Sequence, residues 1–153
     1  LSDINMVSPP IVMKERGVQL TETKQDQTGV FESYIKITLV TEKQTRSVAG
    51  TIFNDGRPRI IQIKGINMEA ELCPHMLLTS NTDKPGYIGK LGNLMGEEGI
   101  NIASFNLGRA DTGGDAIALL GVDTPIDDAV LNKVTQLDLV TQAKALSFPQ
   151  ISG

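Results

Sequence analysis

The sequence has few of the residues that build disulfides, metal sites and catalytic centres. It contains one cysteine and one histidine, so Cys73 has no partner for an internal disulfide, and only His75 lies near it as a further metal ligand. His75 also has no acidic partner nearby in sequence that could help it act as a general base. We therefore predict no catalytic residue and no metal site, and we expect a reducing, cytoplasmic location.

Basic residues and long apolar runs are also scarce. The 14 Lys and Arg residues against 18 Asp and Glu give a net charge of −4, which does not favour nucleic acid as a partner. No apolar run approaches the ~20 residues that span a bilayer, and the start of the chain does not resemble a secretion signal. We expect neither nucleic-acid nor membrane binding.

A dinucleotide-binding motif is missing as well. The nearest glycine pattern, GYIGKLG at residues 86–92, does not have the Gly-x-Gly-x-x-Gly spacing that holds a pyrophosphate. We therefore predict no cofactor in this chain. The first residue is Leu1 rather than Met, which leads to the hypothesis that the chain is a piece of a longer protein.

Composition and patterning indicate a folded chain that begins with an antiparallel sheet. Hydrophobic residues make up 40% and charged residues 21% of the 153 positions, which is typical of globular proteins. Prolines and a glycine flank a predicted helix over residues 11–17. Alternating apolar residues predict strands over 31–40, 46–53 and 59–64, with an Asn-Asp-Gly turn before the third strand. We assign residues 1–70 to this first domain.

Residues 71–153 form the second predicted domain, in the order βαββαβ. The expected strands cover 75–80, 100–107, 116–122 and 139–148. The first expected helix follows a loop at 81–86, with Ile88, Leu91, Leu94 and Met95 on its apolar face, and the second covers about 127–135. This order is typical of the α+β, ferredoxin-like fold, with both helices on one face of an antiparallel sheet. Because that sheet has a bare face and open edges, we expect a dimer or a higher homo-oligomer.

The loop before the first helix of this domain has the chemistry of a small-ligand site. Pro85 fixes the loop exit and Gly86 permits close backbone approach, so the helix start can present free amides to a carboxylate. Asn81 and Asp83 flank the same loop, and Asp83 suits an ammonium group. Asn101 could complete the site from a neighbouring subunit. The pattern favours an amino acid as ligand, whereas the alternative is that these side chains only shape turns.

Four basic residues on the predicted hairpin of the first domain suggest a second site. Arg46, Arg57, Arg59 and Lys64 could form an anion pocket, but basic side chains on an exposed sheet are also common without any ligand.

The chain resembles the C-terminal part of D-3-phosphoglycerate dehydrogenases. The runs NTDKPGYIG at 81–89 and GINIA at 99–103 are similar to the ligand-binding ACT domain of that family, and RSVAGT at 46–51, IQIKGIN at 61–67, NLGR at 106–109 and GGDA at 113–116 extend the resemblance. It implies an intervening, allosteric-substrate-binding portion to about residue 70, followed by an ACT domain. It further implies L-serine or a similar amino acid as effector, at Asn81, Asp83 and Asn101. The family's NAD-dependent oxidation of 3-phosphoglycerate in serine biosynthesis would belong to a parent enzyme whose catalytic and NAD-binding domains lie outside this chain.

Three other interpretations stay open. The chain could be an assembly module that binds no effector, or the regulatory portion of an iron–sulfur L-serine dehydratase. An independent small enzyme is the third, and it has no catalytic constellation to support it.

Overall fold

The computed structural model describes residues 9–23, 33–111 and 114–148. The chain divides into two compact units, Leu1–Val30 and Phe31–Gly153. In the first unit, helix α1 covers Pro9–Glu15, two residues earlier than predicted. Gly17 has a φ of 69°, and the N–H of Val18 donates to the carbonyl of Met13. This is the left-handed glycine ending predicted for the helix.

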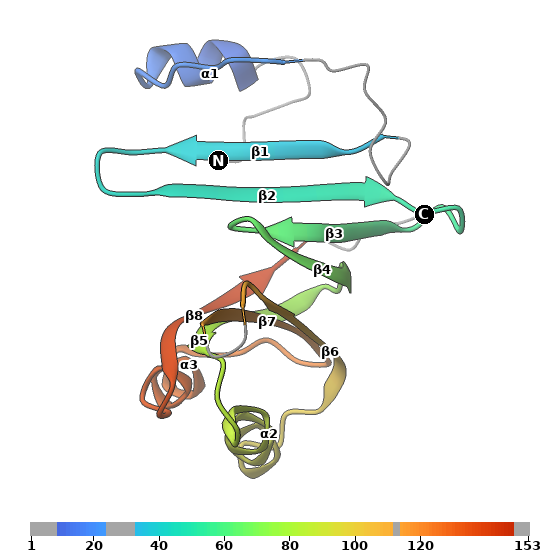
Figure 1. The fold of residues 1–153 in the computed structure, drawn as a ribbon, viewed down its shortest axis with the longest axis vertical. Coiled ribbons are helices and arrows are strands. Elements are labelled where there is room, and N and C mark those ends of the chain that lie inside the picture. The colour runs from blue at the N-terminus through green and yellow to red at the C-terminus, as the bar shows by residue number, and fades with distance from the viewer. Residues whose placement is uncertain (1–8, 24–32, 112–113, 149–153) are drawn as a thin grey trace. The chain divides into compact units, whose positions relative to one another are not determined.

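Sheet A, at the start of the second unit, is an antiparallel meander of four strands. These are β1 (Ile35–Val40), β2 (Thr45–Ile52), β3 (Pro58–Ile63) and β4 (Ile66–Glu71), in spatial order β1-β2-β3-β4 (Figure 1). Strand β4 is absent from the sequence prediction, which has no strand directly after Gly65. Lys64 and Gly65 both have positive φ, 51° and 82°, and they form the two-residue turn of a tight hairpin that leads into β4.

Sheet B and its two helices have the predicted βαββαβ order. The elements are β5 (His75–Thr82), α2 (Tyr87–Glu97), β6 (Ile102–Arg109), β7 (Asp115–Val122), α3 (Asp128–Thr135) and β8 (Val140–Ser147). The strand order is β6-β7-β5-β8, and every pair is antiparallel. Figure 1 shows α2 and α3 on the same face of this sheet. The predicted α+β class with a ferredoxin-like second part is confirmed.

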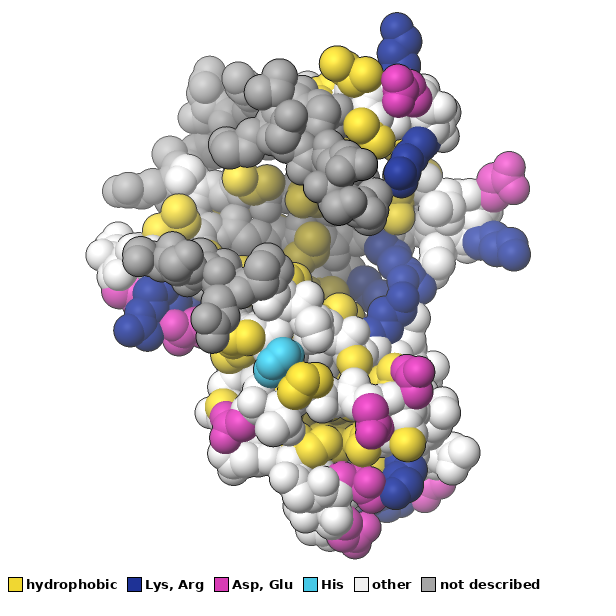
Figure 2. Space-filling model, turned by 180° about the vertical axis from the view of Figure 1, so that it is seen from behind, with side chains coloured by type: hydrophobic (Ala, Val, Ile, Leu, Met, Phe, Trp, Pro, Cys, Tyr) yellow, Lys and Arg dark blue, Asp and Glu magenta, His cyan; other side chains and the backbone are white. Residues whose placement is uncertain are grey.

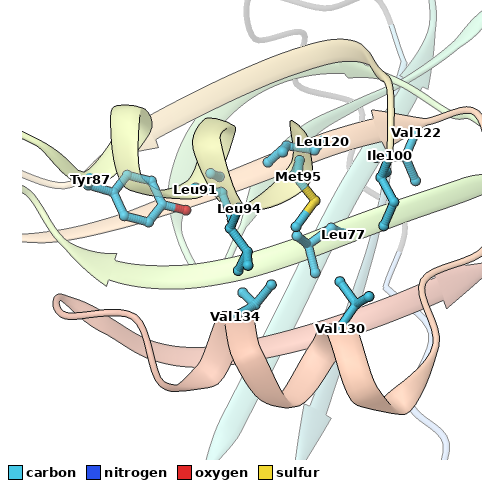
Figure 3. Packing of buried hydrophobic residues seen from close by; sticks show 11 residues of the cluster. Leu77, Tyr87, Leu91, Leu94, Met95, Ile100, Leu120, Val122, Val130 and Val134 are labelled. Carbon is cyan, nitrogen blue, oxygen red and sulfur yellow. The ribbon is translucent and has the colours of Figure 1, made fainter. Parts of the chain in front are cut away.

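The main hydrophobic core lies between sheet B and its helices. Figure 3 shows α2 and α3 directing apolar side chains toward each other and toward Leu77 of β5. On α2 the buried positions are Tyr87, Leu91, Leu94 and Met95, which follow helical spacing. The prediction that Ile88 belongs to this face is wrong: its side chain is 53% exposed, and Tyr87 takes its place one residue earlier.

The opposite face of sheet B packs against sheet A of the same chain. The contact contains buried Ile63, Ile66 and Ala70 from sheet A with Met76, Ile117 and Leu119 from sheet B. This face therefore does not need a second copy to cover it, which removes one of the two reasons for expecting a dimer. The edges β6 and β8 stay unpaired within the part of the chain that the structure describes. Among the residues that the structure describes, no helix is long and apolar enough to cross a membrane.

Candidate functional site

Asn81 lies near the end of β5, a central strand of sheet B, and not in a loop as predicted. Every second residue in this part of β5 lies on the face of the sheet that the helices cover. These residues are all buried: Leu77, Thr79 and Asn81. A register shift between Ser80 and Asn81 against β8 marks a bulge, a feature that often re-aims a side chain at a site. Asn81 is 2% exposed. Its Nδ2 donates to the carbonyl of Thr82 at 3.1 Å, whereas its buried Oδ1 has no hydrogen-bond partner among the described residues.

An unpartnered buried amide oxygen is uncommon in folded proteins, because desolvation costs about 1–3 kcal/mol when no hydrogen bond replaces water. Such an oxygen lining a pocket can accept a hydrogen bond from a ligand. An ammonium group is a suitable donor.

Asp83 follows directly after the end of β5 and is held by its backbone. Its N–H donates to the carbonyl of Gly114 at 2.9 Å, and its side chain is 17% exposed. The Nη1 of Arg109, at the end of β6, lies 3.4 Å from Asp83 Oδ2. The sequence analysis did not include Arg109 among the site residues because it lies far beyond Asp83 in the chain; the signal for it was the run NLGR at 106–109, which contributes to the family resemblance.

The start of α2 forms the third side of the site. Gly86 is the N-cap residue with a φ of 95°, and no side chain caps the helix. This left-handed backbone is what favours glycine here, since nothing lies within 4 Å of a Cβ built on it. The predicted close approach of a ligand to the backbone at Gly86 stays a prediction. The first amides of α2 are without a side-chain acceptor, and they add the positive end of the helix dipole.

These elements enclose a cavity of about 390 Å³, within the range usual for small-molecule sites. The hydroxyl of Tyr87, a residue of the lining, shares a hydrogen bond with the hydroxyl of Thr79, and burial raises the pKa of Tyr87 although that hydrogen bond opposes the shift. The cavity combines a carboxylate, a guanidinium, a buried amide and helix amides over an apolar floor. It is lined by Asn81, Asp83, Lys84, Pro85, Gly86, Tyr87, Ile88, Gly89, Leu107 and Arg109.

Asn101 is not part of this cavity. It follows the C-terminal end of α2, and its Nδ2 donates to Asp123 Oδ2 at 2.6 Å. The 11-residue helix separates it from the cavity by roughly 16 Å at 1.5 Å per residue. Within one chain, Asn101 therefore cannot join Asn81 and Asp83, so its predicted role requires a second subunit.

The four basic residues of the first domain separate into two pairs. At one end of β3, Arg57 Nη1 lies 3.0 Å from Glu71 and Arg59 Nη2 lies 2.8 Å from Asp55. The backbone N–H of Arg57 is the main cause that lowers the pKa of Asp55, and the charge of Arg59 lowers it further.

The second pair, Arg46 and Lys64, lies elsewhere on sheet A and lines a smaller cavity with Lys144 of β8. The structure therefore does not bring the four predicted anion ligands to one place.

Among the described residues, the structure brings no catalytic or metal-binding partner to Cys73 or His75. Cys73 is a partly buried free thiol, and His75 Nδ1 is buried without a hydrogen-bond partner among the described residues. Across residues 9–23, 33–111 and 114–148 there is no group of three His, Cys, Asp or Glu side chains that could hold a metal ion.

Two protein-family models match successive parts of the chain. Residues 1–64 match the D-3-phosphoglycerate dehydrogenase intervening domain, and residues 75–139 match the ACT domain. The chain is 28% identical over 148 residues to D-3-phosphoglycerate dehydrogenase of Bacillus subtilis, covering 97% of this chain and 28% of that protein. It is 34% identical over 144 residues to the enzyme of the same name from Archaeoglobus fulgidus, covering 93% and 27%.

A shorter relative has a different name. The "Probable L-serine dehydratase, beta chain" of Bacillus subtilis is 24% identical over 136 residues, covering 89% of this chain and 62% of that protein. The chain spans just over a quarter of the length of the two dehydrogenases named above. Both matched domains and these dehydrogenase relatives identify the chain as a C-terminal regulatory region of the D-3-phosphoglycerate dehydrogenase family, an intervening-domain portion followed by an ACT domain.

Proposed function

We propose that this chain is the effector-sensing part of a D-3-phosphoglycerate dehydrogenase and that it binds a small amino acid, L-serine, in the cavity at the start of α2. The family relationship indicates a regulatory role in serine biosynthesis. The observation that carries the ligand proposal is the buried, unpartnered Oδ1 of Asn81 beside the carboxylate of Asp83. In this proposal the catalytic and NAD-binding domains belong to the parent enzyme, in the cytoplasm.

Each polar group of the cavity has a role in this proposal. Asp83 and the Oδ1 of Asn81 accept hydrogen bonds from the ligand's ammonium group. The amides after Gly86 and the guanidinium of Arg109 face the ligand's carboxylate, which the helix dipole also favours. The carboxylate of Asp83 has enough lone pairs to keep its ion pair with Arg109 and to accept a hydrogen bond from the ligand's ammonium group at the same time.

We propose further that the site is completed by a second copy. Since Asn101 lies at the far end of α2, its amide would reach the ligand from the neighbouring subunit of a homodimer. An effector held between two subunits shifts the conformational equilibrium by its differential affinity for the two arrangements, and a distant active site would respond to that shift.

Calorimetric titration of the chain with L-serine tests the site. We expect Asp83→Ala to abolish binding, because it removes the only carboxylate that lines the cavity among the described residues. Asp138→Ala is the matched control: this exposed carboxylate pairs with Lys90 outside the cavity and its loss should leave affinity unchanged. Undiminished binding by Asp83→Ala would remove the assignment.

Mixing two variants tests the shared site. Asp83→Ala and Asn101→Ala should each fail to bind L-serine alone. A mixed dimer has one site with both substitutions and one with neither, so mixing should restore a fraction of the sites at wild-type affinity. If mixing restores nothing while both variants still dimerise, Asn101 does not act across the interface.

One observation favours a second candidate function. The chain covers 62% of an L-serine dehydratase beta chain, a larger share than of either dehydrogenase named above. The same regulatory pair attached to a dehydratase would also bind serine, so the coding sequence upstream of Leu1 separates the two: a nicotinamide-dinucleotide fold supports the dehydrogenase and its absence the dehydratase.

A further inference from the structure

Leu139, the residue before β8, has a backbone conformation that is unusual for leucine. Its φ is 76°, in the left-handed region that favours glycine because the Cβ of other residues is crowded there. Strain of this kind persists where the surroundings fix it, often at functional sites. Leu139 does not line the cavity at the start of α2, so a role in that site must be indirect.

The carbonyl of Leu139 anchors the end of β5. It accepts a hydrogen bond from the N–H of Thr82 at 2.9 Å, which fixes the peptide between Asn81 and Thr82. The next peptide is fixed from another strand, because the N–H of Asp83 donates to the carbonyl of Gly114 at 2.9 Å. These two bonds hold the backbone that carries both polar side chains of the cavity, Asn81 and Asp83.

The pairing of β8 with β5 changes at the first residues of β8. Ser80 lies opposite Gln142, whereas Asn81 lies opposite Val140. Thr141 is therefore an extra residue that bulges from β8, and its hydroxyl donates to the carbonyl of Ser80 at 3.0 Å. Because a bulge bends its strand and redirects side chains, the position of Asn81 depends on how the chain enters β8.

The side-chain amide of Asn81 is held by the same stretch of backbone. Its Nδ2 donates to the carbonyl of Thr82 at 3.1 Å, and the residue is buried, so the amide has little freedom to turn. Its Oδ1 is left without a hydrogen-bond partner among the described residues. Since Thr82 holds the amide and Leu139 holds Thr82, a change in the backbone at Leu139 would move that oxygen.

The charged residue next to Leu139 contributes little to this arrangement. The side chain of Asp138 is 80% exposed and pairs with Lys90 at 2.6 Å, and exposed ion pairs add little stability. Figure 2 shows acidic and basic side chains next to one another on the surface of the part that contains sheet B and its helices. The side chain of Leu139, in contrast, is partly buried against the main core. Its packing and its backbone conformation are thus two roles that an experiment must separate.

We propose that Leu139 is a positioning residue of the effector site. Its left-handed backbone places the carbonyl that anchors Thr82, and Thr82 in turn holds the amide of Asn81 so that Oδ1 can accept from the ligand's ammonium group. This role rests on the proposed binding of a small amino acid in the cavity at the start of α2. It belongs to the backbone of residue 139 and not to the leucine side chain.

Substitutions at this one position separate the two roles, with calorimetric titration of L-serine as the assay. Leu139→Gly and Leu139→Asn lose the apolar side chain but accept a positive φ, so each should bind within about twofold of wild type. Leu139→Val and Leu139→Ile keep an apolar side chain but resist a positive φ. Each should weaken binding by at least about tenfold, as expected when a hydrogen bond to a charged group is lost. If side-chain packing were the role, the order would be reversed.

Hydrogen exchange of the Thr82 amide, measured without ligand, gives a second readout. Exchange should be faster in Leu139→Val than in wild type and unchanged in Leu139→Gly, because only valine disturbs the bond to the carbonyl of residue 139. Asp138→Ala is the matched control at the neighbouring position and should change neither the exchange nor the affinity.

The outcomes distinguish failure of this role from failure of the proposed function. A wild-type chain that does not bind L-serine would refute the proposed function and the positioning role together. Wild-type binding that Leu139→Val and Leu139→Ile retain, with unchanged Thr82 exchange, would overturn the positioning role alone. If those two variants do not fold, Leu139→Gly and Leu139→Asn decide: retained affinity supports a backbone role, and lost affinity overturns it.

Discussion

Substitution of Gly108 probes the contact between the two sheets most directly. Gly108 lies on β6, and a Cβ built on it would lie 2.6 Å from the carbonyl oxygen of Asn67 and 2.8 Å from Cγ2 of Ile66, both on β4. Those separations are far below van der Waals contact, and the nearer atom belongs to backbone that cannot rotate away. Gly108→Ala must therefore push β4 from sheet B or distort β6, and it opens the small core around Ile66.

Overpacking of this kind costs about 2–3 kcal/mol of unfolding free energy, which corresponds to roughly 5–10 °C in the thermal midpoint of a chain of this size. Gly96→Ala is the matched control. Gly96 is exposed inside α2, and nothing lies within 4 Å of the position that an alanine methyl would take, so alanine should stabilise by about 0.5–1 kcal/mol. Calorimetric melting of both variants should give shifts of opposite sign. A Gly108→Ala midpoint equal to wild type would refute the close β4–β6 approach.

Two further substitutions test the core and the helix cap. Asp127 Oδ1 accepts from the N–H of Val130 at 2.8 Å and caps α3, so Asp127→Ala should cost about 1 kcal/mol in chemical denaturation, and no change would contradict the cap. Because the folded-state pKa of Tyr87 is raised from 10.0 by burial, the unfolded state releases its proton first as pH rises. Stability should therefore be intact below about pH 10 and fall above it, and Tyr87→Phe should show a smaller fall in pH-dependent melts.

Local sequence signals are enough to predict most of the fold. Spaced apolar residues identify both helices of the second part, and short apolar or alternating runs identify seven of the strands numbered β1–β8. The missed strand, β4, follows a hairpin turn whose first residue is Lys64, whereas the usual signal is asparagine or glycine. The alternation of Ile66, Met68 and Ala70, all at least partly buried, is the remaining clue.

The cavity proposed to bind an amino acid is predictable from the sequence as far as its residues are neighbours in the chain. Asn81, Asp83, Pro85 and Gly86 line one cavity, and their proximity in the chain makes that expectation reasonable. Arg109 could not be found this way because it is distant from Asp83 in the sequence. It lies on β6, and the pairing of β6 with β7 and of β7 with β5 brings it near the end of β5. The same limit applies to the predicted anion residues: the fold pairs Arg57 and Arg59 with acids and brings Lys64 to the cavity that Lys144 lines.

If this chain senses a small amino acid at the cavity beside Asn81 and Asp83, millimolar L-serine should raise its thermal midpoint. A ligand at about 100 times its dissociation constant adds about 2.7 kcal/mol, roughly 5–10 °C here. We expect this rise with L-serine, none with D-serine, and none with L-serine for Asp83→Ala. An unchanged midpoint at saturating L-serine would contradict it and favour an assembly module that binds no effector.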